Sequence, residues 1–183
     1  MKNQYIFLML FLLFISCNHK NNMKKEMADF YSSSIELSVD SLFKYSYNYP
    51  DSLLFDDNQK TLVVYLDSTI CGVCESKKLH QWQTTLSSID SLSNCNPFNV
   101  LFIFSPSEGQ LTSLKVMLKN VEIDYPIIID EKHIFSSQNK HIPHNSLLHT
   151  FLLNEEKRVI LVGDILYNAN VRNLFLDRIR IKE

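Results

Sequence analysis

The sequence predicts an α/β fold with a central mixed sheet flanked by helices. Runs of β-branched and aromatic residues, typical of buried strands, alternate with stretches in which apolar residues recur every three or four positions, typical of amphipathic helices. Near the C-terminal end, two apolar runs follow one another with only a short link. The expected order is β-α-β-α-β, then a β-hairpin and a helix. Strands that alternate with helices are expected to pair in parallel, with right-handed crossovers.

The N-terminal end has the features of a bacterial export signal. Residues 1–16 contain Lys2, then the apolar run "YIFLMLFLLFI", which is short for a membrane span of roughly 20 residues. Cys17 follows a small residue and a polar, basic segment follows it. This arrangement resembles the lipobox of bacterial lipoproteins, in which the cysteine is acylated. We therefore expect a signal peptide at 1–16, a membrane anchor on Cys17, and a position in the cell envelope facing the periplasm or the outside. An ordinary signal peptide or an uncleaved anchor is the alternative.

The remaining length suits one domain of ordinary size and a linker. We expect a flexible tether at 17–34 and a folded domain at 35–183, with its core at about 50–183. The formal net charge of −2 argues against nucleic acid as a partner, because phosphate binding needs a clustered basic surface.

The first half of the domain is expected to hold three strands and two helices. "TLVVYLD" (61–67), "NVLFIFS" (99–105) and "YPIIIDE" (125–131) are the expected strands. Helical spacing links the apolar residues of the two stretches between them. Those residues are Leu79, Trp82, Leu86, Ile89 and Leu92 in the first stretch, and Leu111, Leu114, Met117, Leu118 and Val121 in the second.

The second half is expected to add antiparallel strands. "LLHTFLLN" (147–154) and "RVILVGD" (158–164) are joined by "EEK", a link of hairpin size. A last helix follows, and we expect one face of it to be apolar. That face would contain Val171, Leu174, Phe175 and Ile179.

The chemistry of the sequence centres on Cys71 and Cys74, which are separated by two residues just after the first strand. In an exported protein the default expectation for cysteines is a disulfide. Apart from Cys17, the chain has three cysteines, so one thiol is left over, and we expect it to be Cys95. The pair itself could be a redox dithiol, half of a zinc site or a structural disulfide.

The order of these elements resembles the thioredoxin fold. A buried strand, a Cys-x-x-Cys pair that opens a long helix, a βαβ unit and a terminal hairpin with a helix all match it, over about residues 50 to 183. Similar proteins are thiol-disulfide oxidoreductase-type lipoproteins of Gram-negative bacteria. "HTFLLNEEKRVILVG" is also similar to the hairpin of that family. The resemblance implies thiol-disulfide exchange on exported proteins, with protein thiols or disulfides as substrates and no cofactor.

The position of the pair assigns a role to each cysteine. A thiolate is the nucleophile, and the unpaired N–H groups and dipole of a helix N-terminus favour an anion there. Cys71, at the expected helix start, is therefore the predicted nucleophile. Cys74, one turn further along, would resolve the mixed disulfide. Asp67, at the end of the first strand, is a candidate proton acceptor, although a strand-ending carboxylate is as often a turn residue.

Two positions depart from the resembling family. It usually has a Trp before the pair, where this chain has Ser68, Thr69 and Ile70, and a Pro before the "TF" strand, where this chain has His149. We expect His149 to face the pair and to tune the Cys71 thiolate, or incidentally to help the two thiolates hold Zn²⁺. The alternative is an imidazole that is hydrogen-bonded to the backbone at the start of a strand.

Three other functions can be weighed against thiol-disulfide exchange. A structural zinc site needs four ligands, and no second cysteine pair or closely spaced histidine pair accompanies Cys71 and Cys74, so no native metal is expected. Peroxiredoxins share the fold but place Pro and Thr upstream of the cysteine, whereas here Thr69 is one residue too close and no Pro precedes it. The chain could also be a non-catalytic surface lipoprotein that binds a partner and contains a structural disulfide.

Overall fold

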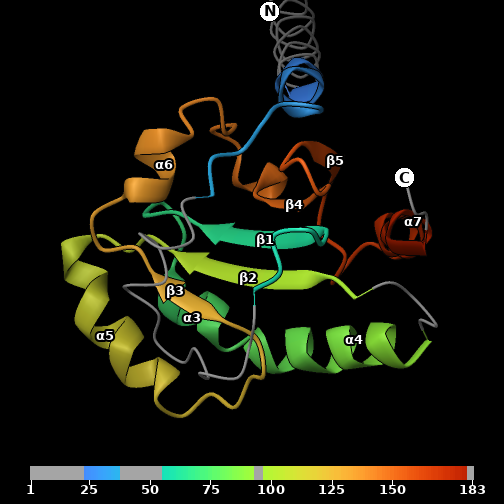
Figure 1. Ribbon diagram of the computed structural model, residues 1–183. Coiled ribbons are helices and arrows are strands. Elements are labelled where there is room, and N and C mark those ends of the chain that lie inside the picture. The colour runs from blue at the N-terminus through green and yellow to red at the C-terminus, as the bar shows by residue number, and fades with distance from the viewer. Residues whose placement is uncertain (1–22, 38–54, 93–96, 181–183) are drawn as a thin grey trace, which may run out of the picture.

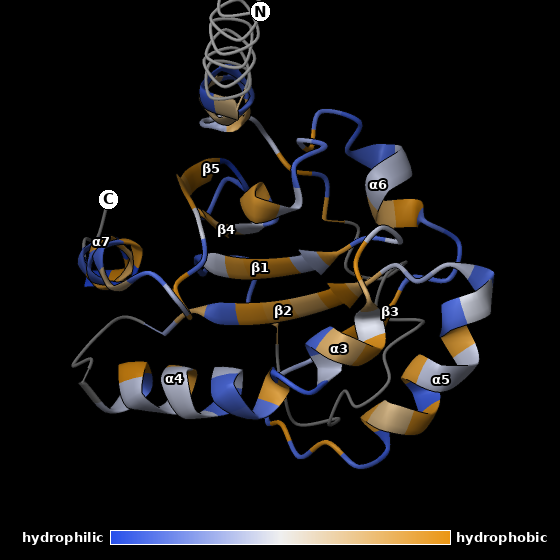
Figure 2. Cartoon of the chain, turned by 180° about the vertical axis from the view of Figure 1, so that it is seen from behind, coloured by the Kyte–Doolittle hydropathy of each residue, from blue (hydrophilic) through white to orange (hydrophobic). Residues whose placement is uncertain are grey.

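The computed structural model describes residues 23–37, 55–92 and 97–180. Its centre is a five-stranded sheet with the strand order β3-β2-β1-β4-β5 (Figure 1). Figure 2 shows apolar residues along the strands and polar residues on the outer surfaces of the helices. The predicted α/β class and the mixed sheet are confirmed.

The three parallel strands lie where the sequence predicts them. β1 is Thr61–Leu66, β2 is Asn99–Phe104 and β3 is Ile127–Ile129, and every residue in them is buried. β2 lies between the other two strands and pairs in parallel with both. Strands buried on both faces read as nearly continuous apolar runs, which is why these segments could be recognised in the sequence.

The predicted hairpin is present, but its first strand starts later than expected. β4 (Thr150–Leu153) pairs antiparallel with β1, and β5 (Val159–Val162) pairs antiparallel with β4. The expected start at residue 147 was wrong, because Ser146–Leu148 forms a 3₁₀ helix, η1. The Asn145 side chain accepts a hydrogen bond from the Leu147 N–H and so stabilises the first turn of η1.

One face of the sheet is covered by α4 (Leu79–Leu92), α5 (Glu108–Leu118) and α7 (Ala169–Arg180) (Figure 1). Most of the predicted apolar stripes pack into the core on this face. The buried helical residues there are Leu79, Trp82, Leu86, Ile89, Leu114, Leu118, Phe175 and Ile179. Leu174 was expected among them but is 52% exposed, because it is turned by about 100° from Phe175 around the helix axis.

The other face is covered by elements that the sequence patterns did not reveal. α6 (Ile134–Gln138) packs Phe135 against the sheet, and it was too short to show a helical period. Residues 23–30 are helical, although we expected a flexible tether up to residue 34. Phe30 and Ile35 are buried in the same cluster, and Ser34 bridges to Arg158 beside the hairpin. The packed domain therefore begins before residue 35, because these two apolar side chains complete the core on this face.

No helix in the described part of the chain is both long and apolar enough to span a membrane. The expected signal peptide at 1–16 and the lipidation site Cys17 lie outside the described residues, and so does Cys95.

Candidate active site

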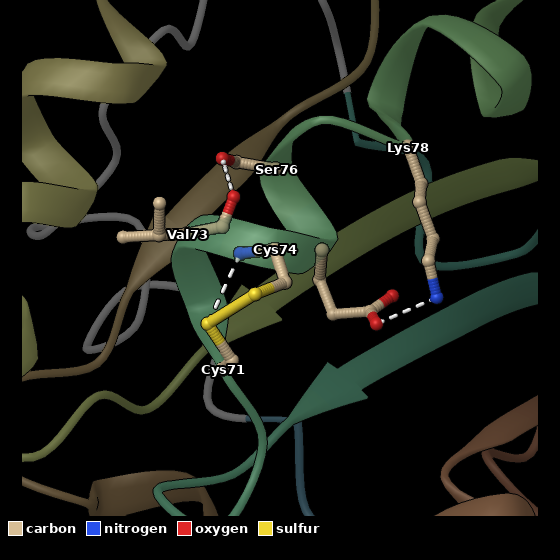
Figure 3. The surroundings of a disulfide bond; sticks show 6 residues. Cys71, Val73, Cys74, Ser76 and Lys78 are labelled. Carbon is tan, nitrogen blue, oxygen red and sulfur yellow. Dashed lines mark hydrogen bonds and ion pairs between the residues drawn. A yellow bond between two sulfur atoms is a disulfide. The ribbon is translucent and has the colours of Figure 1, made fainter.

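Cys71 and Cys74 are joined by a disulfide, with their Cα atoms 5.2 Å apart (Figure 3). The pair follows the carboxyl end of β1, where a short turn leads into α3 (Gly72–Ser76). Both cysteines are exposed to solvent. A disulfide in this position is accessible to an external thiol, as exchange chemistry requires.

The sulfur of Cys71 caps the first turn of α3. Cys71 is the N-cap residue, with extended backbone angles, and the Cys74 N–H donates to Cys71 Sγ at 3.3 Å (Figure 3). The Cys71 carbonyl oxygen accepts from the N–H groups of Cys74 and Glu75. A sulfur in this position faces the unpaired N–H groups of a helix start, which stabilise a thiolate more than a thiol.

The helix that starts at the pair is shorter than predicted. We expected one long helix, but α3 ends at Ser76 and α4 begins at Leu79. The buried Ser76 hydroxyl donates to the Val73 carbonyl at 2.8 Å, and the Lys78 N–H donates back three residues to Glu75, which tightens the turn. Since α3 has only five residues, its field at Cys71 comes from the local N–H groups and not from a long helix dipole.

Gly72 holds this short helix against the core. It is buried, and a Cβ placed on it would lie 3.6 Å from the Leu114 side chain and 3.7 Å from the Phe104 ring. The first turn of α3 therefore lies close to both α5 and the end of β2. This contact fixes the height of the cysteine pair above the sheet.

An ion pair lies directly after the cysteines. Lys78 Nζ is 2.7 Å from Glu75 Oε1, and the same ammonium group lies 5.6 Å from the centre of the Tyr167 ring. The hydrogen bond to Glu75 raises the pKa of Lys78, although burial opposes the rise. Glu75 lies three residues before Lys78 in the chain, whereas Tyr167 becomes its neighbour only because the loop after β5 reaches the start of α4.

Asp67 shapes the turn that presents Cys71. Its Oδ1 accepts from the Thr69 N–H at 2.9 Å and from the Thr69 hydroxyl at 2.6 Å, and the Ile70 N–H donates to its carbonyl oxygen. Among the described residues, no hydrogen bond joins Asp67 to either sulfur. The structure therefore favours the turn role that the sequence left as the alternative for this carboxylate.

His149 is buried at the junction between η1 and β4, with a side chain that is 3% exposed. Its Nε2 lies 2.8 Å from the Pro143 carbonyl oxygen, which is the backbone contact that the sequence left as the alternative. Its Nδ1 is buried, has no hydrogen-bond partner among the residues that the structure describes, and lies 3.9 Å from Asp67 Oδ2. The proposed tuning of Cys71 by His149 stays a prediction.

A cavity of about 200 Å³ opens beside the disulfide. It is lined on one side by Ile70, Glu75 and Lys78, which flank or follow the cysteines, and on the other by Leu147 and Tyr167. Leu147 is 71% exposed and Tyr167 is 62% exposed, so both present apolar surface to solvent.

Within the described part of the chain, no three His, Cys, Asp or Glu side chains are grouped to hold a metal ion. The idea that Cys71, Cys74 and His149 together hold zinc therefore has no support in this geometry.

No protein-family model and no curated protein matches the sequence. Among solved structures, StoA from Bacillus subtilis is 22% identical, covering 60% of this chain and 75% of its own, with a TM-score of 0.43. The exposed lipoprotein thioredoxin Etrx1 from Streptococcus pneumoniae is 12% identical over 67% of this chain and 86% of its own, with a TM-score of 0.45.

A third similar structure is the bacterioferritin comigratory protein of Xanthomonas campestris, described as having alkyl peroxide reduction activity. It is 11% identical over 81% of this chain and 97% of its own, with a TM-score of 0.45. At these identities and TM-scores, the assignment of the fold depends on the strand order and on the position of the cysteine pair. A β3-β2-β1-β4-β5 mixed sheet with Cys71 and Cys74 at the helix start after β1 is a thioredoxin-like fold.

Proposed function

We propose that this protein exchanges thiols and disulfides with other proteins through Cys71 and Cys74. The observation that carries the proposal is the disulfide itself, which is exposed at a helix start with Cys71 Sγ accepting the Cys74 N–H. A disulfide that only cross-links a fold gains nothing from exposure, and this one closes a ring between residues just three positions apart. Short loops of this kind contribute little unfolded-state entropy.

The exchange has two steps. In the reduced protein the Cys71 thiolate attacks one sulfur of a substrate disulfide, so that a new S–S bond forms, the substrate bond breaks and the leaving sulfur takes up a proton. The Cys74 thiolate then attacks Cys71 Sγ, forming the intramolecular disulfide and releasing the second substrate thiol. Two electrons pass from the pair to the substrate. The reverse sequence oxidises a substrate dithiol.

The geometry suits the second step. The Cα atoms of the two cysteines are 5.2 Å apart, within the range that a disulfide spans without movement of the backbone. The Cys74 N–H stabilises negative charge on Cys71 Sγ, both when this sulfur attacks and when it leaves.

We further propose that the domain acts at a membrane surface of the bacterial envelope. The support is the apolar segment within 1–16 followed by Cys17 and a polar stretch. Disulfide chemistry suits an exported protein, because cytosolic thiols are kept reduced. Membrane attachment through acyl chains would hold the exchange site near other exported proteins.

Redox equilibration tests the proposal. The full chain is equilibrated with glutathione or dithiothreitol buffers, and its thiols are counted by alkylation, together with insulin reduction assays on the wild-type protein and Cys71→Ser. We expect a potential above about −300 mV and insulin reduction that is lost in Cys71→Ser. A lower potential without transfer to insulin would instead support a binding module with a structural disulfide.

A further inference from the structure

One ring nitrogen of His149, in the loop that leads into β4, is unsatisfied among the described residues. The other, Nε2, lies 2.8 Å from the Pro143 carbonyl oxygen. A carbonyl oxygen can only accept, so Nε2 must carry the hydrogen. In the neutral ring Nδ1 is therefore a bare lone pair. It is buried and receives no hydrogen bond from the described residues.

A second acceptor lies close to this lone pair. Asp67 Oδ2 lies 3.9 Å from His149 Nδ1. A lone pair close to a carboxylate oxygen is unfavourable, whereas a proton on Nδ1 would turn the same 3.9 Å contact into an ion pair. The arrangement therefore changes from repulsive to attractive when the imidazole takes up a proton.

Asp67 connects this contact to the cysteine pair. Its other oxygen accepts two hydrogen bonds from Thr69, and the turn of residues 67–70 that these bonds close ends immediately before Cys71. The strands add a second connection, because the Tyr65 N–H donates to the His149 carbonyl oxygen at 2.9 Å. The imidazole and the cysteine turn are thus joined through β1.

We infer that His149 is a positioning residue for the exchange at Cys71, acting through Asp67. With a proton on Nδ1, the imidazolium neutralises the Asp67 carboxylate and holds it in the turn. When this proton leaves, the negative charge of Asp67 is uncovered beside the turn and opposes the thiolate of Cys71. This inference rests on the proposed function, since it assigns the regulation of the same site.

Other titratable groups around His149 do not replace Asp67 in this role. The Tyr65 ring lies 5.1 Å from the imidazole, and burial raises the pKa of Tyr65, so it is neutral at physiological pH. Lys140 and His144 line a cavity on one side of His149. On the other side the cavity beside the disulfide is lined by Glu75 and Lys78, which pair with each other, and by Asp164, which accepts from the Leu166 N–H.

Two substitutions separate the charge of Asp67 from its hydrogen bonds. Asp67→Asn keeps an oxygen for Thr69 and offers an N–H to His149 Nδ1, but it has no charge. His149→Gln removes the imidazole, and with it the proton that would neutralise Asp67. His144→Gln is the matched control, because this exposed histidine lines the same cavity as His149.

The experiment measures iodoacetamide alkylation of Cys71 in the reduced full chain from about pH 5.5 to 8.5, followed by mass spectrometry of the peptide that carries it. We expect Cys71 of Asp67→Asn to be alkylated at the wild-type rate at about pH 5.5 and about threefold faster at about pH 8.5. That factor is the size expected when one negative charge near a solvent-exposed thiolate is removed. His149→Gln should be about threefold slower at the acid end and equal to the wild type at the alkaline end. His144→Gln should follow the wild type throughout.

The inference would be overturned if the Cys71 alkylation rate of either variant differed from that of the wild type by the same factor at every pH, or did not differ at all. A purely structural role would not depend on pH. The result is separable from the proposed function, since alkylation needs no protein substrate. If the pH-dependent differences appear but insulin is not reduced, the positioning role stands and the exchange function falls. If insulin is reduced without those differences, the exchange function stands and the positioning role falls.

Discussion

The backbone N–H of Cys74 donates a hydrogen bond to the sulfur of Cys71 at 3.3 Å. The second cysteine of the pair therefore stabilises negative charge on the first through its backbone, in addition to supplying a thiol. Cys71 receives this bond as the N-cap of α3, whereas Cys74 lies inside the helix. The two exposed sulfurs thus have unequal environments.

This inequality predicts unequal thiol reactivity. In the reduced protein at neutral pH, Cys71 should be alkylated roughly tenfold faster than Cys74, since helix-start N–H groups lower the pKa of a thiol by a unit or more. Cys74→Ser should accumulate mixed disulfides through Cys71, which non-reducing electrophoresis and mass spectrometry would detect. Cys95→Ser is the control and should exchange normally. Equal alkylation rates for Cys71 and Cys74 would contradict the assignment of the nucleophile.

The ion pair after the cysteines predicts two effects of opposite sign. Lys78→Met leaves the Glu75 carboxylate without its partner one residue after Cys74, and should slow Cys71 alkylation roughly twofold at about pH 7. Glu75→Gln removes the negative charge and should speed it by a similar factor. Lys157→Met, which changes a lysine near Asp57 at the hairpin turn, is the control. Both effects should shrink in about 1 M salt. Changes of the same sign in both variants would show that packing, not charge, is responsible.

Gly163 at the end of the hairpin predicts a change in stability. Its φ of 135° is disfavoured for residues with a side chain, and an added Cβ would lie 3.2 Å from the Val171 side chain on α7. Gly163→Ala should lower the free energy of unfolding by about 1–3 kcal/mol in urea denaturation. Gly109→Ala is the control, because a Cβ there meets open space within α5 and should be neutral or stabilising. Equal stability of the two variants would contradict the strain at Gly163.

Tyr125 predicts a loss of stability at high pH. Burial, and next the hydrogen bond from its hydroxyl to Asp90, raise the pKa of Tyr125 above its usual value of about 10. Above about pH 10 the unfolded chain loses this proton and the folded chain keeps it, so the free energy of unfolding falls as pH rises. Tyr125→Phe should cost about 1 kcal/mol at about pH 8. Its stability should then fall less steeply between about pH 10 and 11 than that of the wild type. If urea denaturation gave the same fall in the free energy of unfolding for both proteins over that pH range, the raised pKa of Tyr125 would be contradicted.

The N-terminal segment predicts a lipid-dependent location. If Cys17 is acylated, the mature protein should sediment with membranes, because each buried CH₂ contributes roughly 0.8 kcal/mol and several chains add together. Cys17→Ser should accumulate as an unprocessed precursor, measured by metabolic labelling with palmitate and by mass spectrometry. Processing that is insensitive to globomycin, or a soluble mature protein, would count against lipidation.

The strands and the cysteine pair could be predicted because their signals are local. Buried parallel strands such as β2 read as apolar runs, and the step of four residues from Trp82 to Leu86 marks the buried face of α4. The break before α4 was not predicted, because it depends on the Ser76 hydroxyl donating to the backbone of Val73 and not on a Pro or Gly.

Contacts between distant segments explain the other differences. Asp67 and His149 are far apart in the chain, and only the pairing of β1 with β4 brings them together. The tether was expected to extend to residue 34 because that stretch is polar overall. Phe30 and Ile35 are single apolar residues in or next to it, and their burial depends on a surface formed by α6 and the hairpin.

The break between α3 and α4 also affects local motion. Two residues, Lys77 and Lys78, separate the helix that contains the cysteines from the longer helix, so the hydrogen-bond ladder of α4 does not continue through them without interruption. Reduction of the disulfide removes a covalent restraint from a helix of only five residues. The amide protons of α3 should then exchange with deuterium faster than in the oxidised protein, while those of α4 stay protected. That result would show that the cysteine turn loosens on reduction while the rest of the domain remains folded.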